Sequence, residues 1–219
     1  MRVVLGLAAA LIVLLVLAQL ILPGIAADRI RDKVGRYGRV QSVSVSAWPA
    51  IELLWGSVDS VRLRASSLRL NPARSASLLA EARGVSRLDA SVGEVHEEAL
   101  RLTDATLTKR GSALAAQGTV SAADAAAALP TGVSVVLLGS QEGAVRLRVS
   151  GGLFGVGTTI EAIAQASEGR LVARPAGGLL GAFGLTLFAD PRIYVEAVGA
   201  RALSASPPTY VVSMNARLR

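Results

Sequence analysis

Apolar and polar residues alternate one by one along most of the chain beyond residue 40. The segment 57–65, SVDSVRLRA, places Val61, Leu63 and Ala65 on one face of an extended chain and polar residues on the other. The segment 143–151, GAVRLRVSG, repeats this arrangement with Val145 and Leu147. The same period of two returns in segments 40–47, 99–109, 157–167, 192–198 and 209–218. Strands with one apolar and one polar face are typical of antiparallel sheets covered on one side, so the pattern predicts a sheet of about eight strands.

Turn signals separate the predicted strands. They are Gly111-Ser112, Gly139-Ser140, Glu142-Gly143, Glu168-Gly169, Asp190-Pro191 and Pro207-Pro208. Glycine permits the positive φ angles of tight turns, and proline fixes a turn conformation, so each dipeptide predicts a chain reversal.

Two other segments have helical spacing. In residues 23–40, after a predicted break at Pro23-Gly24, apolar residues recur every three to five positions between charges: Ile25, Ile30, Val34 and Tyr37. This spacing predicts a short amphipathic helix packed on the core, with a helix lying in a membrane interface as the alternative. Residues 121–130, SAADAAAALP, predict a second helix with Ser121 as N-cap and Pro130 as its end.

Residues 3–22 carry no charge, and Gln19 is their only polar side chain. A helix of this length covers about 30 Å, the thickness of the hydrocarbon core of a bilayer. The stretch predicts an uncleaved membrane anchor, with a cleaved secretory signal as the alternative because GIAAD follows Pro23. The chain therefore divides into a membrane segment at 1–23 and a single domain at 24–219. Basic residues flank both ends of the segment, so the sequence leaves the side of the membrane open.

The apolar face of this sheet is larger than two or three short helices can cover. The chain has only two Trp, three Tyr and three Phe, so slim aliphatic side chains line that face. Such a sheet either packs into an ordinary solid core or leaves an apolar trough. A trough suits an acyl chain, because burying a methylene contributes about 0.8 kcal/mol and about 15 of them contribute on the order of 12 kcal/mol before the cost of association.

Both tryptophans lie in residues 47–55, AWPAIELLW, directly before a predicted strand. Pro49 fits the first position of a short helix. On that helix the large apolar residues gather on one side: Trp48, Ile51, Leu54 and Trp55. This cluster either closes one end of the sheet or meets a membrane or lipid at the mouth of the trough.

A second apolar segment, residues 177–188, combines four glycines with large side chains, among them Leu179, Leu180 and Phe183. Flexible backbone with apolar side chains is typical of a lid over a cavity mouth or of a loop that dips into a membrane surface. A buried irregular connection is the alternative.

The formal charge of +7 comes almost entirely from arginine, because Lys33 and Lys109 are the only lysines among 23 basic residues. A basic chain fits an anionic membrane surface or nucleic acid, but no basic run is interleaved with aromatic residues, so nucleic acid is not expected. The candidates for contact with phospholipid headgroups are arginines on the polar faces of the strands: Arg62, Arg64, Arg146 and Arg148. If all four lie on the outer face, they would contact the membrane and not the bound lipid.

Residues for catalysis are scarce. The chain has no cysteine, which excludes disulfides and thiolate zinc sites. Its single histidine, His96, lies in the polar stretch EVHEEA and is expected to be a solvated side chain. No P-loop, nucleophile elbow or H-E-x-x-H motif is present, so we expect neither an enzyme nor a bound cofactor or metal.

Several stretches resemble a known family. An apolar residue and Pro49, a short apolar helix and then GSVDSVRLRASSL resemble the cell-envelope phospholipid-binding proteins of the LmeA type, found in actinobacteria. AQGTVSAADAAAALPTGV and EGRLVARP are similar to two later parts of that family. These pieces cover about a third of the chain, and residues 71–98 do not align.

The resemblance implies an α+β fold of the tubular lipid-binding type, in which a long curved antiparallel sheet wraps one or two helices and holds a phospholipid. It also implies a domain on the extracytoplasmic face of the cytoplasmic membrane. We therefore expect a non-catalytic phospholipid-binding protein of the cell envelope that supports lipid or lipoglycan assembly. The alternative is a membrane-anchored structural or adaptor protein without bound lipid.

Overall fold

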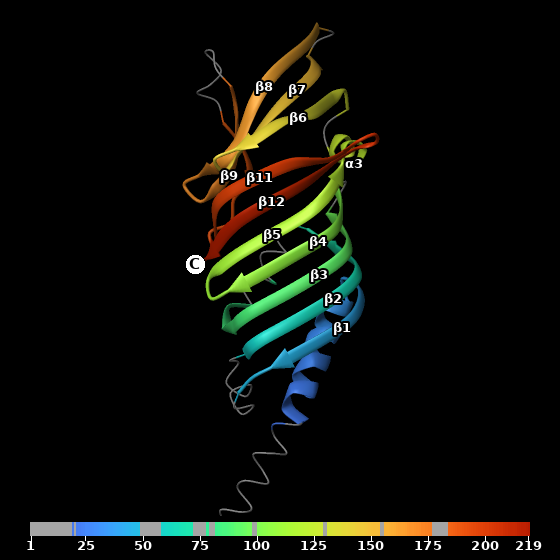
Figure 1. The fold of residues 1–219 in the computed structure, drawn as a ribbon, viewed down its shortest axis with the longest axis vertical. Helices are drawn as coiled ribbons and strands as arrows, with labels where there is room; N and C mark the ends of the chain where they lie inside the picture. Colours follow the sequence, from blue (N-terminus) through green and yellow to red (C-terminus); the bar gives the residue numbers. More distant parts are fainter. Residues whose placement is uncertain are drawn as a thin grey trace, which may run out of the picture.

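The computed structural model describes residues 19, 21–48, 58–71, 78, 82–97, 100–128, 131–153, 156–176 and 184–219. Over these residues the chain is mostly β-structure and forms two sheets (Figure 1). The predicted sheet-dominated fold is therefore confirmed. The division into two sheets differs from the single long sheet that the pattern predicted.

The larger sheet has seven strands in the order β1-β2-β3-β4-β5-β12-β11. They are β1 (Gly38–Ser46), β2 (Val58–Leu70), β3 (Val85–Glu97), β4 (Leu100–Arg110), β5 (Ala113–Ser121), β11 (Ile193–Ala205) and β12 (Pro208–Leu218). Figure 1 shows these strands as one curved surface. The β1–β2 register shifts on both sides of Val40, and the β4–β5 register shifts between Thr103 and Thr106. Such bulges bend a strand and increase its twist, so they contribute to the curvature.

The smaller sheet has five strands in the order β10-β9-β8-β7-β6. They are β6 (Val133–Gln141), β7 (Ala144–Leu153), β8 (Val156–Ser167), β9 (Arg170–Pro175) and β10 (Leu185–Phe188). The long strand β11 contacts β6, β7, β8 and β9 and so joins the two sheets. The joint is apolar, because Val195 and Val198 of β11 form one buried cluster with Val145 of β7 and Ala164 of β8.

Strands β2 and β3 run parallel, with Val61 opposite Leu88 and Leu63 opposite Ala90. This corrects the prediction of an entirely antiparallel sheet. A parallel neighbour requires a crossover of about a dozen residues, and the connection between β2 and β3 supplies one, including the 3-10 helix η2 (Ala82–Gly84). Strand β3 itself was not among the predicted strands.

Residues 21–35 form a helix that packs on the inner face of β2 and β3. Val34 is buried there, and Ile30 and Tyr37 pack against the same cluster, as predicted. Ile25 is 46% exposed and does not belong to this buried stripe, which corrects the prediction for that residue. The break predicted at Pro23-Gly24 is also wrong, because both residues lie within this helix.

No helix within the described residues has both the length and the apolar character needed to cross a bilayer. The anchor predicted at 3–22 lies outside the described residues except for Gln19, Ile21 and Leu22.

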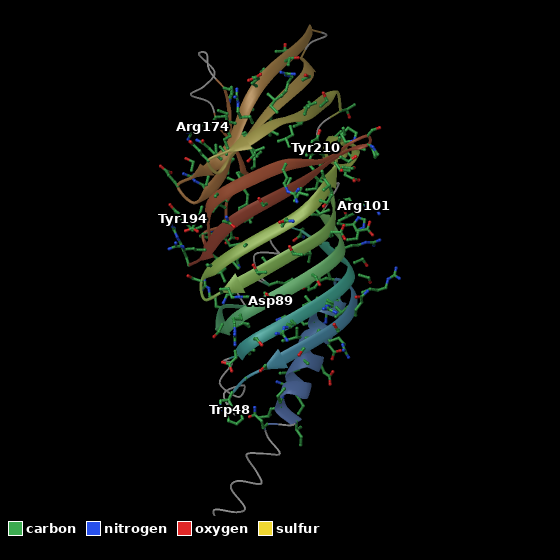
Figure 2. The ribbon with its side chains drawn as sticks, in the orientation of Figure 1. Trp48, Asp89, Arg101, Arg174, Tyr194 and Tyr210 are labelled. Carbon is green, nitrogen blue, oxygen red and sulfur yellow. The ribbon has the colours of Figure 1, made fainter. Side chains whose placement is uncertain are left out.

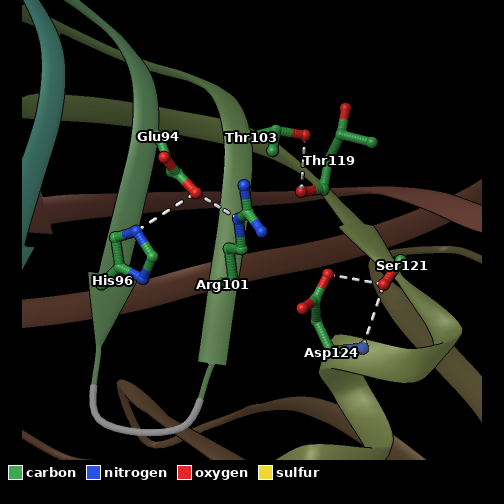
Figure 3. Close-up of polar contacts among 7 residues, drawn as sticks. All are labelled: Glu94, His96, Arg101, Thr103, Thr119, Ser121 and Asp124. Atoms are coloured by element: carbon green, nitrogen blue, oxygen red, sulfur yellow. Dashed lines mark hydrogen bonds and ion pairs between the residues drawn. The ribbon is translucent and has the colours of Figure 1, made fainter.

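The second predicted helix is α3 (Ala122–Ala127), and Ser121 caps it as predicted. The Asp124 backbone N–H donates to the Ser121 hydroxyl oxygen at 3.0 Å (Figure 3). Pro130 lies outside the described residues. Helix α3 follows β5 directly, and the chain leaves the larger sheet at this point. The strand beside β5 in the larger sheet is therefore β12, which comes much later in the sequence.

Most of the predicted turns connect neighbouring strands. Gly111-Ser112, Glu142-Gly143 and Glu168-Gly169 form the tight turns of three hairpins, and the last two dipeptides have positive φ at both residues. Gly139-Ser140 is wrong as a turn, because both residues belong to β6, where the register shifts between Leu137 and Gly139. Glycine at this position marks a bulge inside a strand.

Candidate functional site

A cavity of about 870 Å³ extends along the inner faces of both sheets. Its wall is formed by side chains from β2, β3, β4, β5, β12 and β11 of the larger sheet and from β6, β7, β8 and β9 of the smaller one. Most of these side chains are Val, Leu and Ala. The volume lies within the range of about 300–1,000 Å³ that is usual for small-molecule sites, although so apolar a wall is unusual.

The alternation of the strands directs the apolar side chains to the cavity. On β7, Val145 and Leu147 contribute to the wall, and Arg146 and Arg148 between them are exposed. On β5, Ala116 contributes to the wall, and its neighbour Ala115 is exposed. Successive side chains of a strand point to opposite sides of the sheet, so the pattern of the sequence fixes which residues form the wall.

The wall of the cavity extends across most of the larger sheet. Six neighbouring strands contribute residues to the wall, in the order β2-β3-β4-β5-β12-β11. Five inter-strand spacings separate the first of these strands from the last. Neighbouring strands lie about 4.8 Å apart, so these five spacings cover about 24 Å. One leaflet of a bilayer contributes about 15 Å of hydrocarbon, half of the core thickness. The cavity is therefore long enough for an extended acyl chain.

The charged residues of the described cavity wall all lie on the helix 21–35. Among the described residues of the wall, only Arg29 and Lys33 are charged. Both lie on the helix 21–35, one turn apart, next to Ile30 and Val34 of its buried stripe. Both residues are exposed, so part of each side chain lines the cavity and part reaches the surface. The sequence reasoning did not select these two residues, although their position beside the predicted apolar stripe was a usable signal.

The residues predicted for lipid or membrane contact fall into three groups. Leu63 and Leu147 line the cavity. Trp48 is 74% exposed at one end of the larger sheet (Figure 2). Its backbone N–H donates to the Asp59 carboxylate at 2.7 Å. The others lie outside the described residues, so their roles stay predictions: Ile51, Leu54, Trp55, Leu179, Leu180 and Phe183.

The four arginines predicted near headgroups are all exposed on the side of the sheets away from the cavity: Arg62, Arg64, Arg146 and Arg148. Glu161 of β8 lies between two of them, 3.2 Å from Arg146 and 3.6 Å from Arg148. Exposed ion pairs of this kind contribute at most about 1 kcal/mol to stability. From this face the arginines can contact a membrane surface but not a ligand inside the cavity.

The only histidine lies in a polar group on the surface (Figure 3). His96 Nε2 is 3.1 Å from the Glu94 carboxylate, which also pairs with Arg101 on the neighbouring strand β4. The His96 side chain is 39% exposed, in agreement with the predicted solvated position. Within the described part of the chain, no three His, Asp or Glu side chains are grouped so that they could hold a metal ion.

Lys109 is the one charged residue that the described part of the chain buries. Its side chain is on the same side of β4 as Leu107 of the cavity wall, and its ammonium donates to the Val85 carbonyl oxygen of β3. Burial lowers the pKa of Lys109 from its usual value of 10.5, because desolvation disfavours the charged form. No signal in the alternating segment 99–109 separated this lysine from an exposed one.

Comparisons of this chain with protein-family models, with curated proteins and with solved structures find no match. The likeness to the cell-envelope phospholipid-binding family, drawn from segments of the sequence, therefore stays a prediction.

Proposed function

We propose that this chain is a non-catalytic phospholipid-binding protein that holds acyl chains in the cavity between its two sheets. The observation that carries this proposal is the continuous apolar wall, which extends over both sheets with charge only at Arg29 and Lys33 among its described residues. A polar substrate would leave most of its hydrogen-bonding groups without partners on such a wall, and that costs free energy. The uncharged polar side chains among the described residues of the wall are Thr106, Gln117, Tyr210 and Ser213. A hydrocarbon chain has no such groups.

The energetics favour a long aliphatic ligand. Each methylene that leaves water contributes about 0.8 kcal/mol, so a cavity that accepts a whole acyl chain provides on the order of 10 kcal/mol before the cost of association. The slim side chains of the wall contact such a chain along its length without specific polar contacts.

The proposed setting is the extracytoplasmic face of the cytoplasmic membrane in the cell envelope, where the protein would support lipid or lipoglycan assembly. The apolar run at 3–22 supports a membrane anchor, or a secreted form if this run is cleaved. The Gln19 side-chain amide donates to the Ala47 carbonyl oxygen at 3.1 Å, so the start of the described chain lies beside the end of β1. The curved sheet around the helix 21–35 supports the tubular lipid-binding type of fold that the family resemblance implies (Figure 1).

Photocrosslinking of the full chain in its membrane tests the proposal. A photoreactive amino acid replaces Leu107, which lines the cavity, or its neighbour Thr108, which is exposed on the same strand. A second pair on β6 uses Val135 in the wall and the exposed Ser134. We expect phospholipid adducts, identified by mass spectrometry, at 107 and 135 and not at 108 and 134. Adducts at none of the four positions, in variants whose circular dichroism matches the unmodified protein, would contradict lipid binding.

A structural or adaptor role is the second candidate. It is favoured by exposed apolar side chains on the two edge strands of the smaller sheet: Val136 and Leu138 on β6, and Leu185 and Leu187 on β10. Edge strands with exposed apolar residues are common sites of protein association. Protein adducts at position 136 together with a lack of lipid adducts at 107 and 135 would favour this role.

A further inference from the structure

On the basis of the membrane setting proposed above, we infer that Ile21, Ile25 and Trp48 form an apolar surface that lies in the interface of the membrane holding the predicted anchor. We call these three residues the interfacial surface. They are among the large apolar side chains that the described part of the chain leaves exposed: Ile21 is 54% exposed, Ile25 46% and Trp48 74%. Exposed apolar residues that gather at one place mark a site of interaction.

Hydrogen bonding brings Trp48 to the start of the described chain. The Gln19 side-chain amide donates to the Ala47 carbonyl oxygen at 3.1 Å, and Trp48 follows Ala47 directly. Ile21 is only two positions after Gln19, so Ile21 and Trp48 belong to the same end of the molecule. Figure 2 shows Trp48 at the lower end of the larger sheet, near the predicted anchor.

The first turns of the helix that begins at Ile21 expose an apolar side. Ile21 and Ile25 are four positions apart, so they lie on the same side of the helix. With 3.6 residues per turn, they lie about 180° and about 140° around the helix from Ile30, which packs on the sheet. The first charged residue of this helix is Asp28. An exposed apolar side without charge fits the boundary of a membrane better than water.

The predicted anchor places these residues at the depth of the interface. A helix over residues 3–22 covers about 30 Å, the thickness of the hydrocarbon core, so Ile21 is expected at the boundary between hydrocarbon and headgroups. Ile25, one turn later, lies about 6 Å beyond this boundary. Tryptophan is enriched at this depth because its ring is apolar and carries one polar N–H. Gln19 and the Ala47 carbonyl give each other the hydrogen-bonding partner that hydrocarbon cannot provide.

The interfacial surface fixes the orientation of the molecule on the membrane. The helix and β1 lie at one end of the fold, and the smaller sheet lies at the opposite end (Figure 1). Arg29, one turn after Ile25, is the first residue of the helix that contributes to the cavity wall. The end of the cavity beside the helix is therefore the end nearest the bilayer, and the smaller sheet is directed away from it.

Fluorescence quenching by brominated lipids tests the depth of Trp48. The full chain with W55F keeps Trp48 as its only tryptophan and is reconstituted into phosphatidylcholine vesicles. The bromine atoms lie on the acyl chains, either near the headgroup or near the terminal methyl. We expect bromine near the headgroup to reduce the fluorescence severalfold and bromine near the terminal methyl to reduce it much less, because Trp48 lies at the boundary of the hydrocarbon core.

The matched control is W48F/W55F/L203W, which moves the only tryptophan to another exposed apolar position. Leu203 is 55% exposed on β11, and β11 and β1 are the opposite edges of the larger sheet. Six inter-strand spacings of about 4.8 Å separate these edges, about 29 Å in all. Neither brominated lipid should quench this variant, whose circular dichroism must match that of the unmodified chain.

Three results would overturn the interfacial surface. They are a lack of quenching in W55F, equal quenching by bromine at both depths, and equal quenching in W55F and in the control. The first is expected if a partner protein covers Trp48. A chain that does not float with the vesicles would overturn the membrane setting and the inference together.

A photoreactive residue at position 107, used in the same vesicles, separates this inference from lipid binding in the cavity. Lipid adducts at 107 without depth-dependent quenching of Trp48 would overturn the interfacial surface alone. Depth-dependent quenching without adducts at 107 would support the interfacial surface and contradict the binding of lipid in the cavity.

Discussion

Lys109 shows how a single buried charge responds to its surroundings. Its side chain is 2% exposed, and in the register of the sheet Lys109 lies between Leu88 of β3 and Leu114 of β5. Within the described residues its ammonium is held by a backbone carbonyl and forms no ion pair with a carboxylate. The charged ammonium therefore loses its hydration, and the hydrogen bond to the carbonyl replaces only part of the lost stabilisation. Burial thus disfavours the charged form and lowers the pKa of Lys109.

This burial makes stability depend on pH. Because the pKa of Lys109 is lower in the folded protein than its usual 10.5, the unfolded chain binds more protons in the interval between the two values. The free energy of unfolding should therefore rise as the pH rises through this interval. Denaturant titrations of the unmodified chain and of K109M, which has no titrating group at this position, give the contribution of Lys109 by difference. A difference that stays constant up to pH 10.5 would contradict this assignment.

Gly169 combines two requirements for glycine. It has a φ of 79° in the β8–β9 turn, and a Cβ added there would lie 2.3 Å from Cδ2 of Tyr194 on β11. Gly111 in the β4–β5 turn has a φ of 59° and no atom within 4 Å of an added Cβ. The two glycines therefore separate the cost of backbone conformation from the cost of steric overlap.

We expect G111A to lower the free energy of unfolding by about 1 kcal/mol, the cost of left-handed backbone for alanine. G169A should lower it by about 2–4 kcal/mol, because displacing the packed ring of Tyr194 adds to that cost. Denaturant unfolding of both variants measures the two values. Equal losses would show that the ring moves aside without cost.

At the scale of the elements, strict alternation was the most reliable signal. Segments such as 143–151 became strands whose apolar residues form the cavity wall, since a period of two fixes the face of every side chain. Strand β3 was missed because its alternation of inward and outward residues is broken. Ala90 and Val92 line the cavity two positions apart, but the next residue of β3 that lines it is Val95, three positions after Val92.

The pairing of strands was not predictable from local pattern. The parallel pair β2–β3 depends on where the chain returns after its crossover, and no residue of either strand encodes that direction. After β5 the chain leaves the larger sheet at α3 and forms the smaller sheet with β6 to β10. It then returns, so that β5 pairs with β12, a strand about 90 residues later in the sequence. The inner and outer faces could be predicted from the sequence, whereas the enclosing arrangement of the site could not.

The cap of α3 allows a test at this scale. The Ser121 hydroxyl accepts from the Asp124 N–H and donates to the Asp124 carboxylate at 2.5 Å (Figure 3). S121A should lower the free energy of unfolding by about 1 kcal/mol, since the helix loses the partner of its first N–H groups. The matched control is S44A, at an exposed position of β1, which should change it by less than about 0.5 kcal/mol. Similar values for both variants in thermal or denaturant unfolding would exclude a stabilising cap.

At the scale of the whole molecule, the cavity follows from alanines placed between aliphatic neighbours on the inner faces of the sheets. Ala116 of β5 lies opposite Met214 of β12 and Leu107 of β4, and all three contribute to the wall. A solid core would require larger residues at such positions, because protein interiors are normally packed without voids. The chain instead combines alanines with aliphatic neighbours over both sheets, which leaves room for an aliphatic ligand.

Filling this space from within should exclude the ligand and leave the fold intact. A116F adds a ring at the middle of the wall, and the cavity has room to accept it, so the thermal midpoint should stay the same or rise. A115F adds the same ring to the exposed side of the same strand and leaves the cavity unchanged. With the photoreactive residue at 135, on the far side of the cavity from the helix, lipid adducts should fall severalfold in A116F and persist in A115F. If A116F and A115F both formed as many lipid adducts as the unmodified chain, the prediction would be contradicted. Lipid would then reach β6 without passing Ala116, and not through the cavity along the larger sheet.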